Sequence, residues 1–123
     1  MNRRRDGGQA TVELALVLPV VALLLLAIIQ FTVVGHGEVV TVHAAREGAR
    51  AAAVGADDGA VRAAVVRQSS LPAGRVEITV SRDRETVTVT VRYRQATDIA
   101  MVGPLIPDVD HTASATMRRE DVE

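Results

Sequence analysis

The longest unbroken hydrophobic stretch of the chain runs from Leu14 to Val34, 21 residues without a charged side chain. At about 1.5 Å per residue, a helix of this length measures about 31 Å, close to the roughly 30 Å hydrocarbon core of a bilayer. Pro19 lies inside the stretch and removes one backbone donor, which a membrane helix tolerates, so we expect a kink rather than a break. The pattern predicts one transmembrane helix that begins near Gln9 or Ala10.

Helical character continues beyond the hydrophobic stretch. Residues 38–55 are dominated by Ala, Glu and Arg and contain no proline. Within them, Ala44, Gly48 and Ala52 recur at every fourth position, which lines small residues along one ridge and allows a second helix to approach closely. We therefore expect the membrane helix to continue as one rod to about Val54.

A second, shorter helix is predicted over about residues 58–68. The Asp57-Asp58 pair supplies an N-cap for it, because a carboxylate can accept from the free N–H groups of a first turn. Val61 and Val65 are four residues apart and share one face of this helix. A turn containing Ser, Pro and Gly follows and ends the helix.

The hydrophobic period then changes from the helical repeat to two. Apolar and polar residues alternate over 76–81 and 87–94, and a polar hairpin loop at 81–85 joins them. The same alternation returns over 109–118 and predicts a third strand, which a two-stranded ribbon needs for independent stability. Residues 96–107 are predicted to be irregular, with one helical turn.

These elements define an α+β fold class. A long N-terminal transmembrane helix continues into a small domain with a second helix and a three-stranded antiparallel sheet. We divide the chain into a basic, unstructured leader at 1–8, the long-helix region at 9–55 and an extracytoplasmic α+β domain at 56–123.

Charge around the predicted span indicates its orientation. Three Arg residues at positions 3–5 precede the span, and the next Arg after it is Arg46. Basic residues stay preferentially on the cytoplasmic side, so we expect the N-terminus inside and residues from about 36 outside. A cleaved secretory signal is disfavoured, because the apolar stretch is too long and residues 31–34 offer no small-x-small site.

Composition excludes several classes of function. The chain has no Cys, so structural disulfides and thiolate chemistry are excluded. A net charge of -1 gives no reason to expect nucleic acid as a partner. All 14 basic residues are Arg, which leaves no lysine to act as nucleophile or base. Because no nucleophile–base pair is recognisable either, we expect a protein that is not an enzyme.

Three histidines, His36, His43 and His111, raise the question of a metal site. His43 and Glu47 are four residues apart and could place two ligands on one helix face. No third ligand is nearby in the sequence and there is no HExxH motif, whereas catalytic zinc needs three protein ligands. We expect neither a metal site nor a cofactor.

Glu13 is the charged residue at the entrance to the hydrophobic stretch. A carboxylate at the centre of a membrane costs about 2.5–3.5 kcal/mol on insertion scales and less near an end, so Glu13 either lies among headgroups or gains a cationic partner. If the chain were cut after Gly8, Gln9 would acquire an amino group that is normally protonated at neutral pH. Between neighbouring chains, amine and carboxylate could then neutralise each other and set the register.

The same residues carry a family resemblance. Gly8 followed by QATVE and an apolar helix resembles the processing site of type IV prepilin-like proteins. Over about residues 7–55 the chain resembles the TadE-like family of pilus assembly proteins, which are minor pilins or pseudopilins of the tight-adherence (Flp-type) pilus. TASATMRRE at 112–120 is similar to family tails. Leu14 departs from the major Flp pilins, which carry an aromatic residue there, and this argues against a major pilin.

The resemblance implies a pilin-like fold and a role for each of three residues. Gly8 would precede the peptidase cut, Gln9 would be the new N-terminus and Glu13 the assembly carboxylate. The implied partners are membrane lipid, a prepilin peptidase, other pilin or pseudopilin subunits and the assembly platform. The implied location is the cytoplasmic (inner) membrane, crossed once, with incorporation into a surface pilus left open. The alternative is an uncleaved, membrane-anchored structural protein of the cell envelope.

Overall fold

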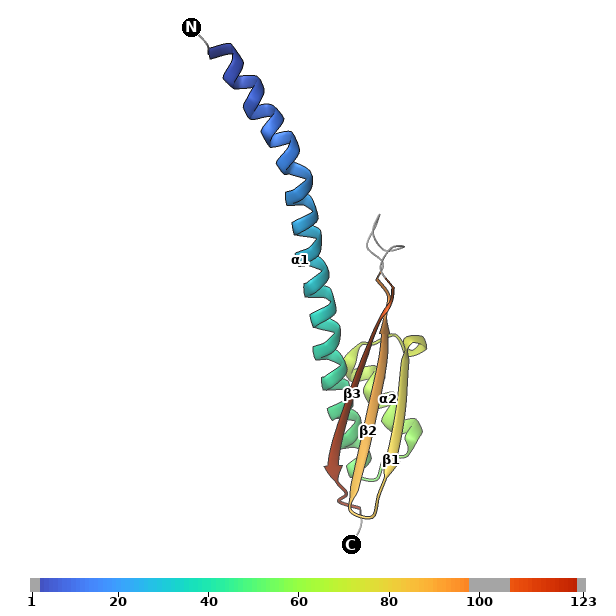
Figure 1. The fold of residues 1–123 in the computed structure, drawn as a ribbon. Coiled ribbons are helices and arrows are strands. Elements are labelled where there is room, and N and C mark those ends of the chain that lie inside the picture. Colours follow the sequence, from blue (N-terminus) through green and yellow to red (C-terminus); the bar gives the residue numbers. More distant parts are fainter. Residues whose placement is uncertain (1–2, 98–106, 122–123) are drawn as a thin grey trace. The chain divides into compact units, whose positions relative to one another are not determined.

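The computed structural model describes residues 3–97 and 107–121, and the side chains of residues 8–97 and 107–121. In chain order the elements are α1 (Arg3–Ala53), α2 (Asp58–Ser69), the 3₁₀ helix η1 (Ala73–Arg75), β1 (Val76–Arg82), β2 (Thr86–Gln95) and β3 (Val109–Arg118) (Figure 1). The predicted α+β class is confirmed. The chain divides into two compact units, an N-terminal unit, Met1–Val33, and a C-terminal unit, Val34–Glu123.

Helix α1 begins at Arg3 rather than near Gln9 or Ala10, so the prediction of an unstructured leader is wrong for residues 3–8. The Gly7-Gly8 pair favours an unstructured leader, because each Gly is about 1 kcal/mol less favourable than Ala inside a helix. A helix that is already formed downstream extends without a new nucleation step and gains one hydrogen bond for each residue added. This cooperativity outweighs the local preference of the two glycines.

The prediction that one helix runs to about Val54 is confirmed, because α1 continues across Pro19 and ends at Ala53. Its end is formed at Gly55, whose φ of +90° lies in the left-handed region. Glycine adopts this conformation without a steric penalty, as is common just beyond a helix. The amide of Gly55 donates to the carbonyl of Ala52 at 3.2 Å, which satisfies one of the last helix carbonyls.

The three strands form one antiparallel sheet in the order β1-β2-β3. Val80 of β1 pairs with Val89 of β2, which pairs with Ala115 of β3. Inward valines and outward hydroxyl residues alternate on β2, as the period of two predicted. The predicted third strand, 109–118, is confirmed at the same bounds.

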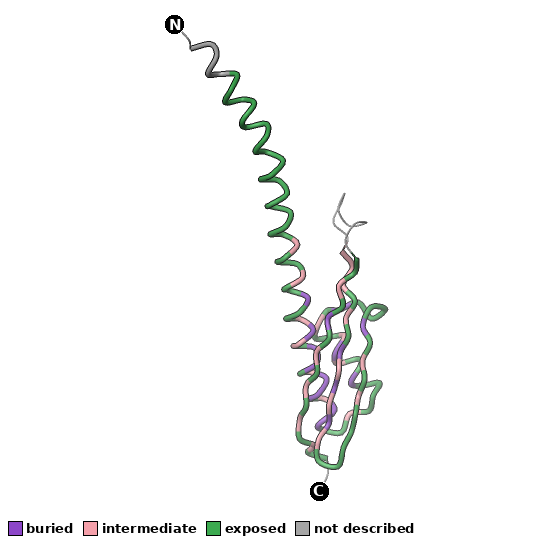
Figure 2. Tube along the Cα trace, in the orientation of Figure 1, coloured by how far each residue is buried: buried purple, intermediate pink, exposed green. Residues whose placement is uncertain are grey.

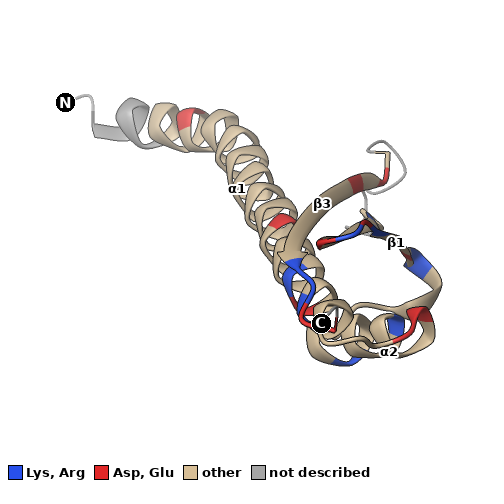
Figure 3. Cartoon of the chain, turned by 90° about the horizontal axis from the view of Figure 1, so that it is seen from below, with Lys and Arg blue, Asp and Glu red and all other residues tan. Residues whose placement is uncertain are grey.

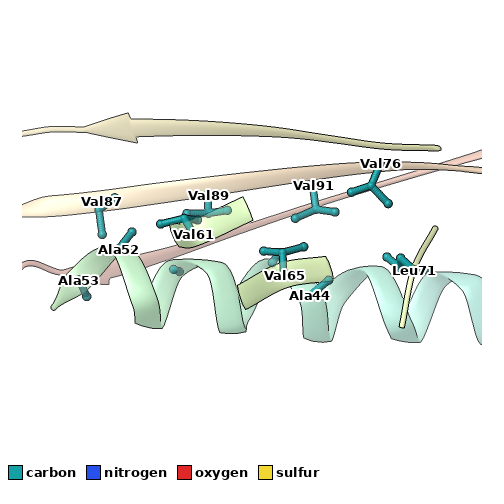
Figure 4. Packing of buried hydrophobic residues seen from close by; sticks show 12 residues of the cluster. Ala44, Ala52, Ala53, Val61, Val65, Leu71, Val76, Val87, Val89 and Val91 are labelled. Carbon is teal, nitrogen blue, oxygen red and sulfur yellow. The ribbon is translucent and has the colours of Figure 1, made fainter. Parts of the chain in front are cut away.

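The core of the C-terminal unit lies between one face of the sheet and two helical segments (Figures 2 and 4). Small alanines from the last part of α1 face valines of α2 and of the strands, so the layers approach closely without large side chains. The buried cluster consists of Ala44, Ala45, Ala49, Ala52, Ala53, Val61, Val65, Leu71, Val76, Val87, Val89 and Val91.

Gly48 lets α1 approach α2 and β2 closely in this core. A Cβ atom at this position would lie 2.8 Å from Val65 Cγ2 of α2 and 2.8 Å from Val89 Cγ1 of β2. The ridge of small residues predicted from the four-residue repeat thus serves packing within the C-terminal unit.

Helix α2 begins as predicted. The Oδ1 atom of Asp57 accepts a hydrogen bond from the amide of Ala60 at 2.7 Å, which caps the first turn. Ser70 ends the helix in the left-handed conformation, with φ of 55°. Val61 and Val65 are fully buried on the inner face.

The segment predicted to be irregular with one helical turn, 96–107, mostly lies outside the described residues, which exclude 98–106. At its two ends, the hydroxyl of Thr97 donates to the carbonyl of Pro107 at 3.3 Å. This bond holds together the two chain ends that leave β2 and enter β3.

Candidate functional site

Gly8, Gln9 and Glu13 all lie in α1 within the N-terminal unit, and all three are exposed. Gln9 and Glu13 are four residues apart and are therefore neighbours on one helix face. A Cβ atom on Gly8 would meet nothing within 4 Å. The helix thus gathers the three residues on one accessible stretch, which is compatible with their predicted roles in processing and assembly.

The residues that follow Glu13 expose an apolar surface on every side of α1. Leu16, Leu23 and Phe31 are 71%, 67% and 82% exposed. A long part of the helix carries no charged residue (Figure 3). Such a surface is far larger than the apolar patches of a soluble monomer and must be covered by lipid or by other apolar helices.

Within the described part of the chain, one helix is long and apolar enough to cross a membrane by length and composition. It extends over Gly8–Ala53, and its most apolar stretch is entirely exposed. A membrane-anchored protein with one N-terminal span therefore fits both the sequence pattern and the structure.

Gln30 adds a polar group to this apolar surface. Its Oε1 atom is shielded from solvent and has no hydrogen-bond partner among the described residues. Thr32, two residues later, bonds its hydroxyl to the carbonyl of Ile28 at 3.0 Å. A shielded amide oxygen without a donor is unfavourable, so rotation of the Gln30 side chain toward a donor on another helix would be favourable.

His111 is a buried polar residue, and its partners could not be identified from the sequence. It is 3% exposed. Its Nδ1 lies 3.1 Å from Oε2 of Glu38 on α1, and its Nε2 lies 2.7 Å from Oε1 of Gln95 on β2. Tyr93 stacks beside the ring, with centroids 6.2 Å apart. The alternation over 109–118 placed His111 on the inner face, but no local signal identifies partners 73 and 16 positions away.

No histidine is placed in a metal site. In the described ranges, 8–97 and 107–121, no group of three or more His, Cys, Asp or Glu side chains could hold a metal ion. His43 is exposed on α1 and Glu47 is half-buried, and the structure brings no third ligand to them there. His111 of β3 instead forms hydrogen bonds with Glu38 of α1 and Gln95 of β2.

A charged pair lies directly after β3. Nε and Nη2 of Arg119 donate to Oδ1 and Oδ2 of Asp121 at 3.0 and 2.9 Å. These side-chain hydrogen bonds lower the pKa of Asp121 and raise the pKa of Arg119. The amide of the neighbouring Glu120 donates to the carbonyl of Ala53 at 2.9 Å. The segment just after β3 therefore also satisfies a carbonyl at the end of α1.

Comparison with known proteins bears on the same region. Residues 8–50 match the family model described as TadE-like protein, and the resemblance found in the sequence is confirmed over these residues. No curated protein and no solved structure matches the chain. The TadE-like match includes Gly8, Gln9 and Glu13 and points to involvement in the assembly of a tight-adherence pilus, with pilus-related proteins as partners.

Proposed function

Since residues 8–50 of this chain are TadE-like, we propose that it is a single-pass minor pilin or pseudopilin of a tight-adherence (Flp-type) pilus or a related secretion apparatus. Its role in this proposal is physical rather than enzymatic. Helix α1 packs among the helices of other subunits, and the C-terminal unit is presented outside. The observation that carries the proposal is Glu13, exposed at the start of an apolar helix and four residues after Gln9, inside the TadE-like match.

Processing after Gly8 gives the carboxylate its counter-ion. The new amino group of Gln9 is protonated at neutral pH, since α-amino groups titrate near pH 7.7–8.0. In a low-dielectric environment an uncompensated carboxylate is expensive, and a neighbouring chain's amine relieves that cost. A shift of one subunit along its neighbour would separate the two charges, so the pair defines one axial register.

The proposed location is the cytoplasmic membrane, with the N-terminus inside. Three Arg residues at positions 3–5 precede the span, and the next Arg is Arg46. This asymmetry supports an outside C-terminal unit. In the membrane the exposed apolar side chains contact lipid, and in an assembly the same side chains contact neighbouring helices.

The mass of the mature N-terminus tests processing directly. The protein is recovered from the membrane fraction of its native cell, and its N-terminal peptide is sequenced by mass spectrometry. We expect a chain that begins at Gln9. Recovery of the intact chain with residues 1–8 attached would overturn the pilin proposal and favour the rival, an uncleaved envelope anchor.

Assembly is tested with Glu13→Ala against Glu47→Ala, which removes a carboxylate from α1 in the C-terminal unit. Glu13→Ala should insert into the membrane but lose crosslinks between α1 and pilin subunits or the assembly platform. Glu47→Ala should retain both properties. Normal assembly of Glu13→Ala would refute the role proposed for the carboxylate.

A further inference from the structure

A hollow of about 260 Å³ lies at one end of the sheet, on the face that points away from the core. Arg92 and Arg94 alternate along β2 with the inward Val91 and Tyr93, which places both arginines on this outer face. The hollow is lined chiefly by charged side chains and one glycine: Gly74, Arg75, Glu77, Arg92, Arg94 and Asp110.

The hollow has more positive than negative charge, because three arginines face two carboxylates. Nε of Arg94 donates to Oδ1 of Asp110 at 3.2 Å, so one carboxylate already has a partner. Within residues 8–97 and 107–121, the side chains of Arg75 and Arg92 form no ion pair or hydrogen bond. Two guanidinium groups are therefore available to a ligand, and their planar forks suit a carboxylate.

Hydrogen bonds within the protein fix the backbone on one side of the hollow. Nη2 of Arg62 on α2 donates to the carbonyls of Ala73, the first residue of η1, and Val76, the first residue of β1, at 3.3 and 3.5 Å. The amide of Arg75 donates to the carbonyl of Pro72 at 2.9 Å. At Gly74 even an added Cβ would meet nothing within 4 Å, so access from that side is open.

From the hollow, the outer face of the sheet continues as two rows of hydroxyl groups, here called the hydroxyl face. The strand register puts three hydroxyl residues side by side in each row: Thr79, Thr90 and Ser114, and then Ser81, Thr88 and Thr116. The hydroxyls of Thr90 and Ser114 are 2.8 Å apart, as are those of Thr88 and Thr116. These bonds fix the side chains, and each hydroxyl keeps further capacity to donate or accept.

We propose that the hollow and the hydroxyl face together bind an acidic polysaccharide. Its carboxylate lies between Arg75 and Arg92, and the hydroxyl groups of adjoining sugars bond to the two rows. Each exposed charge pair is weak on its own. A polymer that engages several such contacts at once binds far more tightly through effective concentration.

The composition of the face selects this ligand over other polymers. A protein partner would need an apolar or aromatic centre to its interface, and the rows offer none. A nucleic acid would need several uncompensated positive charges and aromatic rings for stacking, whereas Tyr93 lies on the inner face beside His111. This inference does not depend on the proposed role in pilus assembly.

The experiment measures binding of the full chain, in uncharged detergent, to polygalacturonate and to the same polymer with its carboxylates methyl-esterified. We expect binding to the acidic polymer, at least tenfold weaker binding to the ester, and weakening by added salt. Arg75→Gln together with Arg92→Gln should weaken binding at least tenfold, and Arg92→Lys alone should give an intermediate loss, because the charge stays but the fork is lost. Arg67→Gln, at an exposed position of α2, is the matched control and should bind as the parent does.

Equal binding of the acidic and esterified polymers would overturn the carboxylate assignment. So would a loss in Arg67→Gln as large as that in the double variant. Poly-glutamate binding more tightly than polygalacturonate would overturn the sugar assignment and indicate an acidic protein segment instead. Unchanged thermal unfolding of the arginine variants shows that a loss of binding comes from the site rather than from the fold.

Discussion

A Cβ atom on Gly37 would lie 2.7 Å from Nε2 of His111, closer than real Cβ atoms come to a neighbour. Gly37 thereby lets α1 approach β3 closely, and in the next position Glu38 reaches Nδ1 of His111 at 3.1 Å. The carbonyl of Gly37 also accepts from the buried hydroxyl of Thr41 at 2.7 Å. A glycine inside a helix is here required by a contact between elements rather than by a turn.

Gly37→Ala should therefore destabilise the C-terminal unit although Ala is the better helix former. The new methyl displaces His111 or moves Gln95 and breaks their 2.7 Å hydrogen bond, and such overpacking costs about 1–3 kcal/mol against about 1 kcal/mol gained in helix propensity. Thermal unfolding of the full chain in detergent, followed by the fluorescence of Tyr93, the single tyrosine, measures the loss. Gly35→Ala is the control, since a Cβ there meets nothing within 4 Å, and it should not lower the melting temperature.

Gly48→Ala should destabilise the same unit more than Gly37→Ala does. Its methyl would lie 2.8 Å from Val65 Cγ2 and 2.8 Å from Val89 Cγ1, both on fully buried side chains that have little room to move. We expect a loss of about 1–3 kcal/mol in the free energy of unfolding. Denaturant unfolding provides the measurement, and Gly74→Ala, at an open position, should unfold like the parent. Parental stability of Gly48→Ala would show that α1 does not pack this closely.

The charged pair at the end of β3 predicts a pH dependence. The pKa of Asp121 is lowered, chiefly by the hydrogen bonds from Arg119. Its stabilising contribution is therefore complete above the unfolded value of about 3.9 and is lost as the pH falls through the lower, folded value. The Arg119 guanidinium stays charged throughout this range. Asp121→Asn should lower the melting temperature at pH 7, and this difference from the parent should shrink as the pH falls below about 3.9. Asp108→Asn, at an exposed position, should have little effect across the same range.

Much of the C-terminal unit could be predicted because its strands have two different faces. Val87, Val89 and Val91 point into the core and alternate with hydroxyl residues, and a shift by one residue would exchange the two faces. The third strand was predicted at its observed bounds, Val109–Arg118, for the same reason. The start of α1 could not be predicted in this way, because local glycine preference competed with a long cooperative helix.

Contacts between distant positions could not be predicted. Nothing in the sequence relates Glu38, Gln95 and His111 to one another, and only the fold brings them together. The hollow likewise depends on distant positions. It forms because the pairing of β1 with β2 brings Arg75 of η1 near Arg92 of β2. By contrast, Gly8, Gln9 and Glu13 lie within six consecutive residues, so a candidate site could be recognised from spacing alone.

The helical leader predicts an effect on processing. Helix α1 runs through the bond between Gly8 and Gln9, and a peptidase must open that turn to reach the backbone. Gly7→Ala would stabilise the turn by about 1 kcal/mol, which lowers the open fraction about fivefold. Pulse-chase conversion to the mature form should slow by that factor, whereas Ala15→Leu, further along the helix, should be processed at the parental rate. Unchanged conversion of Gly7→Ala would show that opening of this turn does not limit cleavage.

Gln30 predicts a polar contact between subunits. Its shielded Oε1 has no donor among the described residues, and a hydrogen bond between membrane helices contributes about 0.6–2 kcal/mol. Gln30→Leu keeps the side chain large and removes the amide, so the affinity between α1 and a neighbouring subunit's helix should fall about three- to thirtyfold. A membrane association assay with crosslinking measures it. Thr32→Val is the control, because the Thr32 hydroxyl already bonds to Ile28 of its own helix and offers little to a neighbour. Equal association of Gln30→Leu and the parent would mean that the amide oxygen faces no other subunit, and association would then depend on apolar packing and the Glu13 charge pair alone.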